Sequence, residues 1–102
     1  MTNCVSQKPF KGPHYEARFA RHNSILVTAT GDNRTGGWHT YFEIEPTFAP
    51  PVRLEFVNCP PEGNANDLIT PFAIHIGLKA INGQKTVTID DAGGSHHVTI
   101  HK

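Results

Sequence analysis

The fold is decided by the stretch Phe72-Ala73-Ile74-His75-Ile76-Gly77-Leu78-Lys79-Ala80, in which an apolar side chain stands at every second position with small or polar residues between. A period of two places the apolar side chains on one face of an extended strand. The same alternation, or a compact β-branched composition, recurs between turn residues in 15–19, 24–30, 38–45, 52–56, 86–89 and 96–101. We therefore predict seven short strands and no helix.

Seven short alternating strands in a chain of 102 residues favour an all-β fold. The expected architecture is an antiparallel β-sandwich, immunoglobulin-like in its general arrangement. We expect residues 1–13 to form an N-terminal tail or a short edge strand, and residues 14–102 to form a single β-sandwich domain. Cys4 and Cys59 can form one disulfide or none, and we expect the reduced state because no export signal precedes them.

The turn Asn82-Gly83 sets the expected register of the strands on either side of it. Asn-Gly is a strong signal for a two-residue hairpin, because both positions need a positive φ. A turn centred there pairs apolar residues with apolar residues, Leu78 with Val87 and Ile76 with Ile89. In a Greek-key arrangement the two strands lie in different sheets instead.

A second turn decides whether histidines and an aspartate line up on the exposed face. If Gly93-Gly94 closes this hairpin, Ile89 faces Val98, and His75, Asp90 and His97 form a row across three strands. We call these three residues the histidine row. If the loop is longer by one step at each side, Asp90 faces Ser95 instead.

Seven histidines in 102 residues make a metal site worth testing. The histidine row is the candidate, because imidazole and carboxylate groups bind Zn²⁺. The alternative is an exposed polar face with ordinary cross-strand pairs. Loops at 31–33, 64–67 and 90–94 resemble fragments of Ca²⁺ loops, although Asn and Asp also satisfy their own turns. No cofactor other than Zn²⁺ or Ca²⁺ is expected.

Thr35-Gly36-Gly37-Trp38 is the most distinctive local string. Its glycines permit positive φ or close backbone approach, and its indole either covers the core or anchors a partner. Trp38, together with Asn33 and Arg34 of the same loop, is therefore the candidate partner-binding site.

Composition narrows the classes of function. Nine Lys and Arg balance nine Asp and Glu, so the formal net charge is zero at pH 7, which argues against a nucleic-acid or membrane-surface binder. No apolar run approaches the length of a membrane span. Nucleotide-binding loops, Cys-x-x-Cys and nucleophile elbows are missing from the sequence, so catalysis is not favoured. Residues 1–9 lack the apolar centre of a signal peptide, so we expect a cytoplasmic protein if the chain is complete, and an exported one if a leader was removed.

Four short motifs follow one another along the chain: Ile25-Leu26-Val27-Thr28-Ala29-Thr30-Gly31, Thr35-Gly36-Gly37-Trp38, Pro50-Pro51 and Pro60-Pro61-Glu62-Gly63. Over roughly residues 24–72 the chain resembles a family of uncharacterised bacterial β-sandwich proteins with a central Thr-Gly-Gly-Trp motif. The resemblance implies an all-β fold and a bacterial origin, and it implies no activity.

We predict a non-catalytic module that binds a protein partner or a second copy of itself, because edge strands expose unpaired backbone groups. One alternative is a metal-binding domain that holds Zn²⁺ or Ca²⁺ at the histidine row. Another is a protease-inhibitor-like domain that presents the loop at 58–71, pre-ordered by Pro60, Pro61 and Pro71. Neither nucleic acid nor a membrane is expected as a partner.

Overall fold

The structure is a computed structural model that describes residues 4–46, 52–63 and 66–102. These residues form seven strands and no helix, which confirms the all-β prediction: β1 (Lys11–Ala20), β2 (Ser24–Asn33), β3 (His39–Ile44), β4 (Arg53–Cys59), β5 (Thr70–Lys79), β6 (Thr86–Asp91) and β7 (Gly94–His101). The described part of the chain thus contains no helix long and apolar enough to cross a membrane. The predicted boundary at residue 14 falls inside β1, and the division into a tail and one domain stays a prediction.

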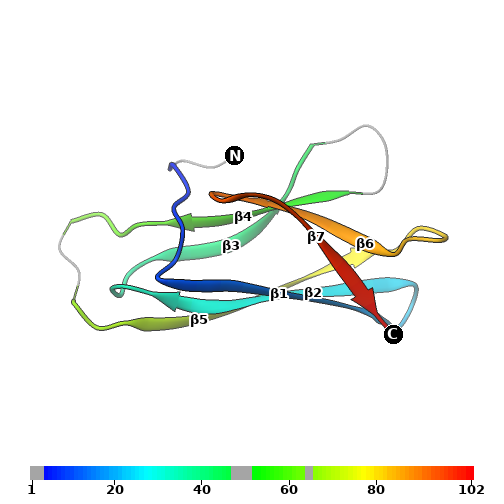
Figure 1. The fold of residues 1–102 in the computed structure, drawn as a ribbon, viewed down its shortest axis with the longest axis horizontal. Helices are drawn as coiled ribbons and strands as arrows, with labels where there is room; N and C mark the ends of the chain where they lie inside the picture. Colours follow the sequence, from blue (N-terminus) through cyan, green and yellow to red (C-terminus); the bar gives the residue numbers. More distant parts are fainter. Residues whose placement is uncertain (1–3, 47–51, 64–65) are drawn as a thin grey trace.

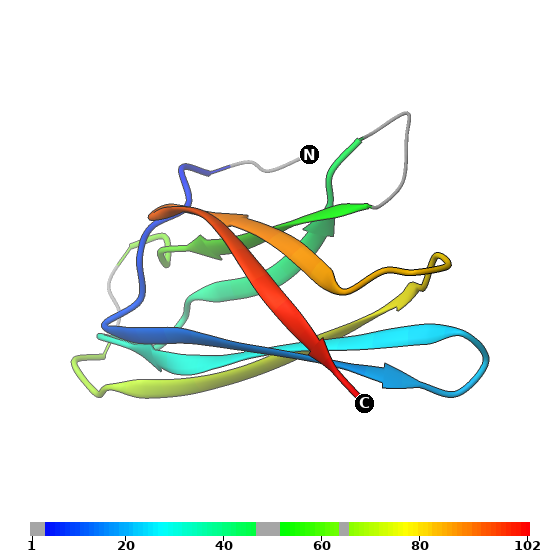
Figure 2. The same ribbon diagram turned by 45° about the vertical axis from the view of Figure 1, so that its right-hand side comes forward.

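The strands form one sheet in the order β3-β4-β6-β7-β1-β2-β5. Strands β3, β4 and β6 lie over β1, β2 and β5, and β7 runs diagonally between these halves (Figures 1 and 2). The end strands β3 and β5 approach each other, so the sheet is nearly barrel-shaped.

The sheet is mixed, so the expectation of a purely antiparallel arrangement is wrong. β1 runs parallel to β7, and β4 runs parallel to β6. The β4–β6 ladder is parallel because β5, which lies between them in sequence, belongs to the other half. The chain therefore crosses over before it returns beside β4, as a parallel pair requires.

β5 pairs with β2 along ten residues, and Ile25 faces Leu78 within this ladder. The predicted hairpin between β5 and β6 is therefore wrong, although Gly83 has the positive φ of 81° that suits a turn. β2 is ten residues long and β6 only six, so β2 offers β5 more cross-strand apolar pairs than β6 does. β5 and β6 are not neighbours, but both belong to the same seven-stranded sheet, so the alternative that puts them in different sheets is not confirmed either.

In the hairpin of β6 and β7, Asp90 faces Ser95, which is the pairing of the second alternative. The loop is not longer, however, because Asp91 faces Gly94 across a two-residue turn at Ala92 and Gly93. The first alternative, in which the two adjacent glycines close the turn, is wrong. Ile89 consequently faces His96 rather than Val98.

The apolar core lies between the two halves of the sheet. Phe56 is buried at its centre, and its ring centroid lies 5.8 Å from that of Tyr15, 6.1 Å from that of Phe42 and 5.7 Å from that of Phe72. Aromatic contacts at these separations add to the stability that burial alone provides. The buried cluster comprises Ala17, Ile25, Val27, Ala29, Leu54, Phe56, Leu78, Ala80, Val87, Ile89 and Ile100.

Residues 4–10, which we call the N-terminal strap, run past β4 before β1 begins (Figure 1). Cys4 forms a disulfide with Cys59 at the end of β4, so the expected reduced state is wrong. The strap brings the two Cα atoms to 5.9 Å, within disulfide range. Asn58 binds the strap further, because its backbone N–H donates to Ser6 Oγ at 2.9 Å and its carbonyl accepts from the Gln7 N–H at 2.9 Å.

Candidate functional site

The structure does not bring the histidine row together. His75 lies on β5 opposite Thr28, whereas His97 lies on β7 opposite Thr88. The predicted row is wrong because β5 pairs with β2, so His75 and Asp90 stand on strands that are not neighbours. Within residues 4–46, 52–63 and 66–102, no group of three or more His, Cys, Asp or Glu side chains is placed to hold a metal ion.

The three candidate partner-binding residues do not form one exposed surface. Asn33 is buried, and its side-chain amide exchanges hydrogen bonds of 2.8 and 3.2 Å with the amide of Asn58. The guanidinium of Arg34 lies 4.6 Å from the ring centroid of Phe10 in the strap. Trp38 is half-buried, and its indole N–H donates to a hydroxyl of the same loop at 2.9 Å. These contacts brace the loop, and Asn33 faces the interior.

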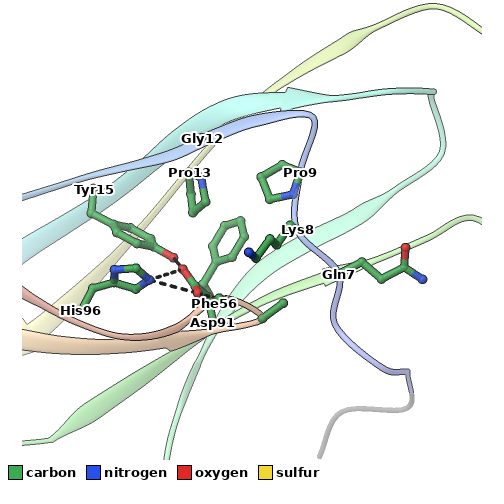
Figure 3. Close-up of a pocket in the computed structure, with 11 residues that line it drawn as sticks. Gln7, Lys8, Pro9, Gly12, Pro13, Tyr15, Phe56, Asp91 and His96 are labelled. Atoms are coloured by element: carbon green, nitrogen blue, oxygen red, sulfur yellow. Dashed lines mark hydrogen bonds and ion pairs between the residues drawn. The ribbon is translucent and has the colours of Figure 1, made fainter.

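A cavity of about 280 Å³ opens between the strap, the start of β1 and the turn that joins β6 to β7 (Figure 3). Its apolar walls are the rings of Pro9, Pro13, Tyr15 and Phe56. Pro13 lies at an irregularity in the pairing of β1 with β2, where the register shifts between Lys11 and His14. Proline suits such a position because it has no backbone N–H to give to the ladder.

Asp91 is the centre of the polar end of the cavity, and only 7% of its side chain is exposed. Its carboxylate accepts hydrogen bonds from the Tyr15 hydroxyl at 2.5 Å and from the Gly93 N–H at 2.7 Å. The Nε2 atom of His96 lies 3.0 Å from each of its oxygens. A buried carboxylate is tolerated only where donors surround it in this way. The hydrogen bond from Gly93 closes an Asx turn, in which an aspartate satisfies its own turn. This structural role is the alternative to a Ca²⁺ loop at 90–94.

The environment of Tyr15 determines its protonation state. Burial raises the pKa of its hydroxyl far above the ordinary value, and the hydrogen bond to Asp91 and the negative charge of that residue raise it further. Tyr15 therefore stays protonated at neutral pH and serves as a hydrogen-bond donor. Its ring also lies 5.6 Å from that of His96, which completes this wall.

Lys8 extends from the strap toward the Asp91 cluster (Figure 3). A Cβ built on Gly93 would lie 3.1 Å from Lys8 Cε and 3.7 Å from its Nζ, so the lysine covers the glycine of the turn. Among the described residues, no carboxylate forms an ion pair with Lys8. Asp91 Oδ1 lies 3.2 Å from the same Cβ position. Within residues 4–46, 52–63 and 66–102, the cavity therefore combines apolar rings with an ammonium group that forms no ion pair.

A second cluster lies outside this cavity, where Glu45 follows β3. A hydrogen bond with Asp90 raises the pKa of Glu45 to about 7, with help from burial. The same hydrogen bond lowers the pKa of Asp90 to about 2, and the Ser95 hydroxyl and the Arg53 guanidinium lower it further. Arg53 Nη2 lies 2.9 and 3.0 Å from the two Asp90 oxygens. Between about pH 2 and about pH 7 the pair therefore carries one proton, on Glu45.

Sequence reasoning missed Lys8, Tyr15 and Asp91 as members of one site. The sequence carries a partial signal, because the alternation in 96–101 puts His96 on the same face as Val98 and Ile100. In the structure the Nε2 atom of His96 lies 3.0 Å from Asp91. Tyr15 and Asp91 are 76 residues apart. No local spacing links them, and only the diagonal path of β7 beside β1 brings them together.

Comparisons of the chain with protein-family models, with curated proteins and with solved structures found no match.

Proposed function

We propose that the protein is a non-catalytic binding module whose ligand site is the cavity beneath the strap. The observation that carries the proposal is that the oxygens of Asp91 are already used by Tyr15, Gly93 and His96. A carboxylate engaged by three donors is a poor general base, and a phenol held in its protonated form is a poor nucleophile. The cavity therefore offers a binding surface rather than reacting groups.

The shape and size of the cavity fit a small ligand. Ligand sites are mostly apolar concave surfaces with a few polar groups that set the orientation of the ligand. The volume of about 280 Å³ is near the lower limit of such sites. It suits a compound with one ring, or one side chain of a partner protein.

The test is an NMR titration of the protein with a set of single-ring compounds. We expect some of them to shift the backbone amide signals of Asp91 and Gly93. Ala92→Phe narrows the cavity, because Ala92 lines it, and should abolish these shifts. Ala20→Phe adds the same side chain at an exposed position on β1 and should leave them intact. If no compound shifts the two signals at millimolar concentration, the proposal is overturned.

We also propose the finer architecture in which the two halves of the sheet act as the layers of an immunoglobulin-like sandwich. The inward-facing apolar residues of both halves support it, as does the position of β7, which pairs with β6 in one half and with β1 in the other. The similarity of residues 24–72 to a bacterial β-sandwich family stays a prediction.

The alternative of a protease-inhibitor-like domain is favoured by one observation in the loop at 58–71. Leu68 is 71% exposed and Ile69 is 53% exposed, next to each other before β5. The side-chain oxygen of Asn66 accepts from the Gly36 N–H at 3.2 Å and from the Leu68 N–H at 3.3 Å. A braced loop with exposed aliphatic side chains loses little entropy on binding.

This alternative is tested by incubating the protein with a panel of serine, cysteine and metalloproteases. Inhibition of one protease that Leu68→Asp abolishes, and that Ile44→Asp does not, would support it. Ile44 is a matched control because it is an aliphatic residue on β3 whose exposure of 53% equals that of Ile69. A panel without inhibition excludes this function for the proteases tested.

A further inference from the structure

We infer that the ligand of the cavity carries a carboxylate on a small apolar or aromatic body. The inference rests on the proposed function and adds the chemical class of the ligand. It comes from the way in which the polar groups of the cavity are already occupied, and from the rings that form its walls.

The carboxylate of Asp91 is already occupied by hydrogen-bond donors. Its carboxylate is almost fully buried, and the donors on Tyr15, Gly93 and His96 surround its oxygens. An ammonium ligand would have to displace one of these donors to reach the carboxylate. If the displaced donor were Tyr15, its half-buried hydroxyl would lose its partner, which is costly.

Lys8 provides the opposite charge in an accessible form. Its side chain is exposed, belongs to the lining of the cavity and extends toward the Asp91 cluster (Figure 3). Because no described carboxylate pairs with it, a ligand carboxylate would gain a charge-assisted hydrogen bond without breaking an existing one. A positively charged ligand would be repelled at the same point.

The remaining walls determine the rest of the ligand. Pro9, Pro13, Tyr15 and Phe56 present rings to the space beside Lys8. Such walls favour an apolar or aromatic body that removes them from water. A phosphate dianion needs several donors in a fixed arrangement, whereas this cavity offers one flexible ammonium. A singly charged carboxylate on a ring would pair with the Lys8 ammonium and pack against the rings of the walls.

The experiment compares three probes with the same ring: benzoate, benzyl alcohol and benzylamine. Each is titrated into the ¹⁵N-labelled protein, and binding is read from the amide signals of Asp91 and Gly93. We expect benzoate to bind about ten-fold more tightly than benzyl alcohol, because hydrogen bonds to charged groups are stronger than neutral ones. We expect benzylamine to bind most weakly.

Lys8→Met removes the charge and keeps most of the side-chain length, so it should reduce benzoate binding to the level of benzyl alcohol. Lys8→Arg should retain the preference for benzoate. Lys85→Met removes a lysine that does not line the cavity and should change nothing. Folding of each variant is confirmed by the dispersion of its amide spectrum.

The outcomes separate the inference from the proposed function. If benzyl alcohol or benzylamine binds as tightly as benzoate does, the carboxylate inference is overturned and the binding proposal stands. If benzoate keeps its advantage in Lys8→Met, the inference is also overturned. If none of the three probes shifts the signals of Asp91 and Gly93, the inference and the cavity as a single-ring site both fail.

Discussion

At the scale of single residues, the buried carboxylate of Asp91 links three segments of the chain. Tyr15 belongs to β1, Gly93 to the turn after β6, and His96 to β7. Each donates to the same carboxylate or lies within hydrogen-bond distance of it. Loss of any one donor leaves a charge that is nearly sealed from water, so these residues matter for stability whether or not a ligand is present.

Tyr15→Phe keeps the ring that packs on Phe56 and removes only the hydroxyl donor. We expect the free energy of unfolding to fall by about 1–3 kcal/mol, because Asp91 loses a hydrogen bond while it stays buried. Chemical denaturation measures the change. The control is Tyr41→Phe, since the Tyr41 hydroxyl makes no hydrogen bond within the described residues. Equal losses in the two variants would contradict the prediction.

The pair of Glu45 and Asp90 predicts a dependence of stability on pH. The folded-state pKa of Glu45 is raised from 4.5 to about 7, so folding favours its protonated form. This contribution to stability is complete below pH 4.5 and is lost as the pH rises through about 7. The pKa of Asp90 is lowered from 3.8 to about 2, so its contribution is present above pH 3.8 and is lost as the pH falls through about 2.

Glu45→Gln should therefore remove the part of the stability loss that the natural protein shows between pH 4.5 and pH 8. Urea denaturation at a series of pH values tests this, and the difference between the two proteins isolates the contribution of Glu45. Glu16→Gln, an exposed carboxyl group on β1, is the control and should leave the profile unchanged. An unchanged profile in Glu45→Gln would disprove the prediction.

At the scale of elements, the N-terminal strap is both a structural tie and a wall of the cavity. The disulfide fastens its first described residue, and Asn58 holds its middle through Ser6 and Gln7. The next residues, Lys8 and Pro9, line the cavity. The position of the ligand site therefore depends on a segment outside the sheet ladders.

Replacing both Cys4 and Cys59 by Ser should lower the free energy of unfolding by about 2–4 kcal/mol, because the unfolded chain regains the freedom of a long loop. The sequence separation of the two cysteines is 55 residues. Thermal denaturation with and without a reducing agent measures the effect. The natural protein should lose stability when it is reduced, whereas the double variant should not respond. A natural protein insensitive to the reductant would count against a stabilising disulfide.

At the scale of the whole molecule, Phe56 joins the two halves of the sheet. Its ring packs on Tyr15 of β1 and on Phe72 of β5 in one half, and on Phe42 of β3 in the other. Strands that are far apart in the sheet order thus all contact the buried side chain of Phe56. We expect unfolding to be cooperative, because neither half buries its apolar face without the other.

Phe56→Ala should reduce the free energy of unfolding by about 3–5 kcal/mol, since it opens a cavity at the centre of the core. Phe19→Ala is the control, because Phe19 is already 37% exposed and its truncation should cost clearly less. Urea denaturation measures both variants. Similar losses would show that the core is not centred on Phe56.

The alternation along the chain was enough to predict which segments are strands and most of the side chains that face inward, although Phe19 and Ile44 are exceptions, because they are 37% and 53% exposed. Residues 72–80 show why: a period of two is a local property of the chain, and burial of Ile74, Ile76 and Leu78 on one face requires no knowledge of the partner strand. The Asx turn before Gly93 is local for the same reason. Both features depend only on residues that are close together in the sequence.

The pairing of the strands, and the candidate site with it, follows from the complete fold. β2 and β6 both offer an alternating apolar face to β5, so the sequence pattern does not choose between them, and the longer ladder prevails. The disulfide, and the cluster of Lys8, Tyr15, Asp91 and His96, likewise join segments that no local pattern connects. Cys4 and Cys59 are 55 residues apart, and Tyr15 and Asp91 are 76 residues apart. Contacts at such separations follow from how the whole sheet closes over its core.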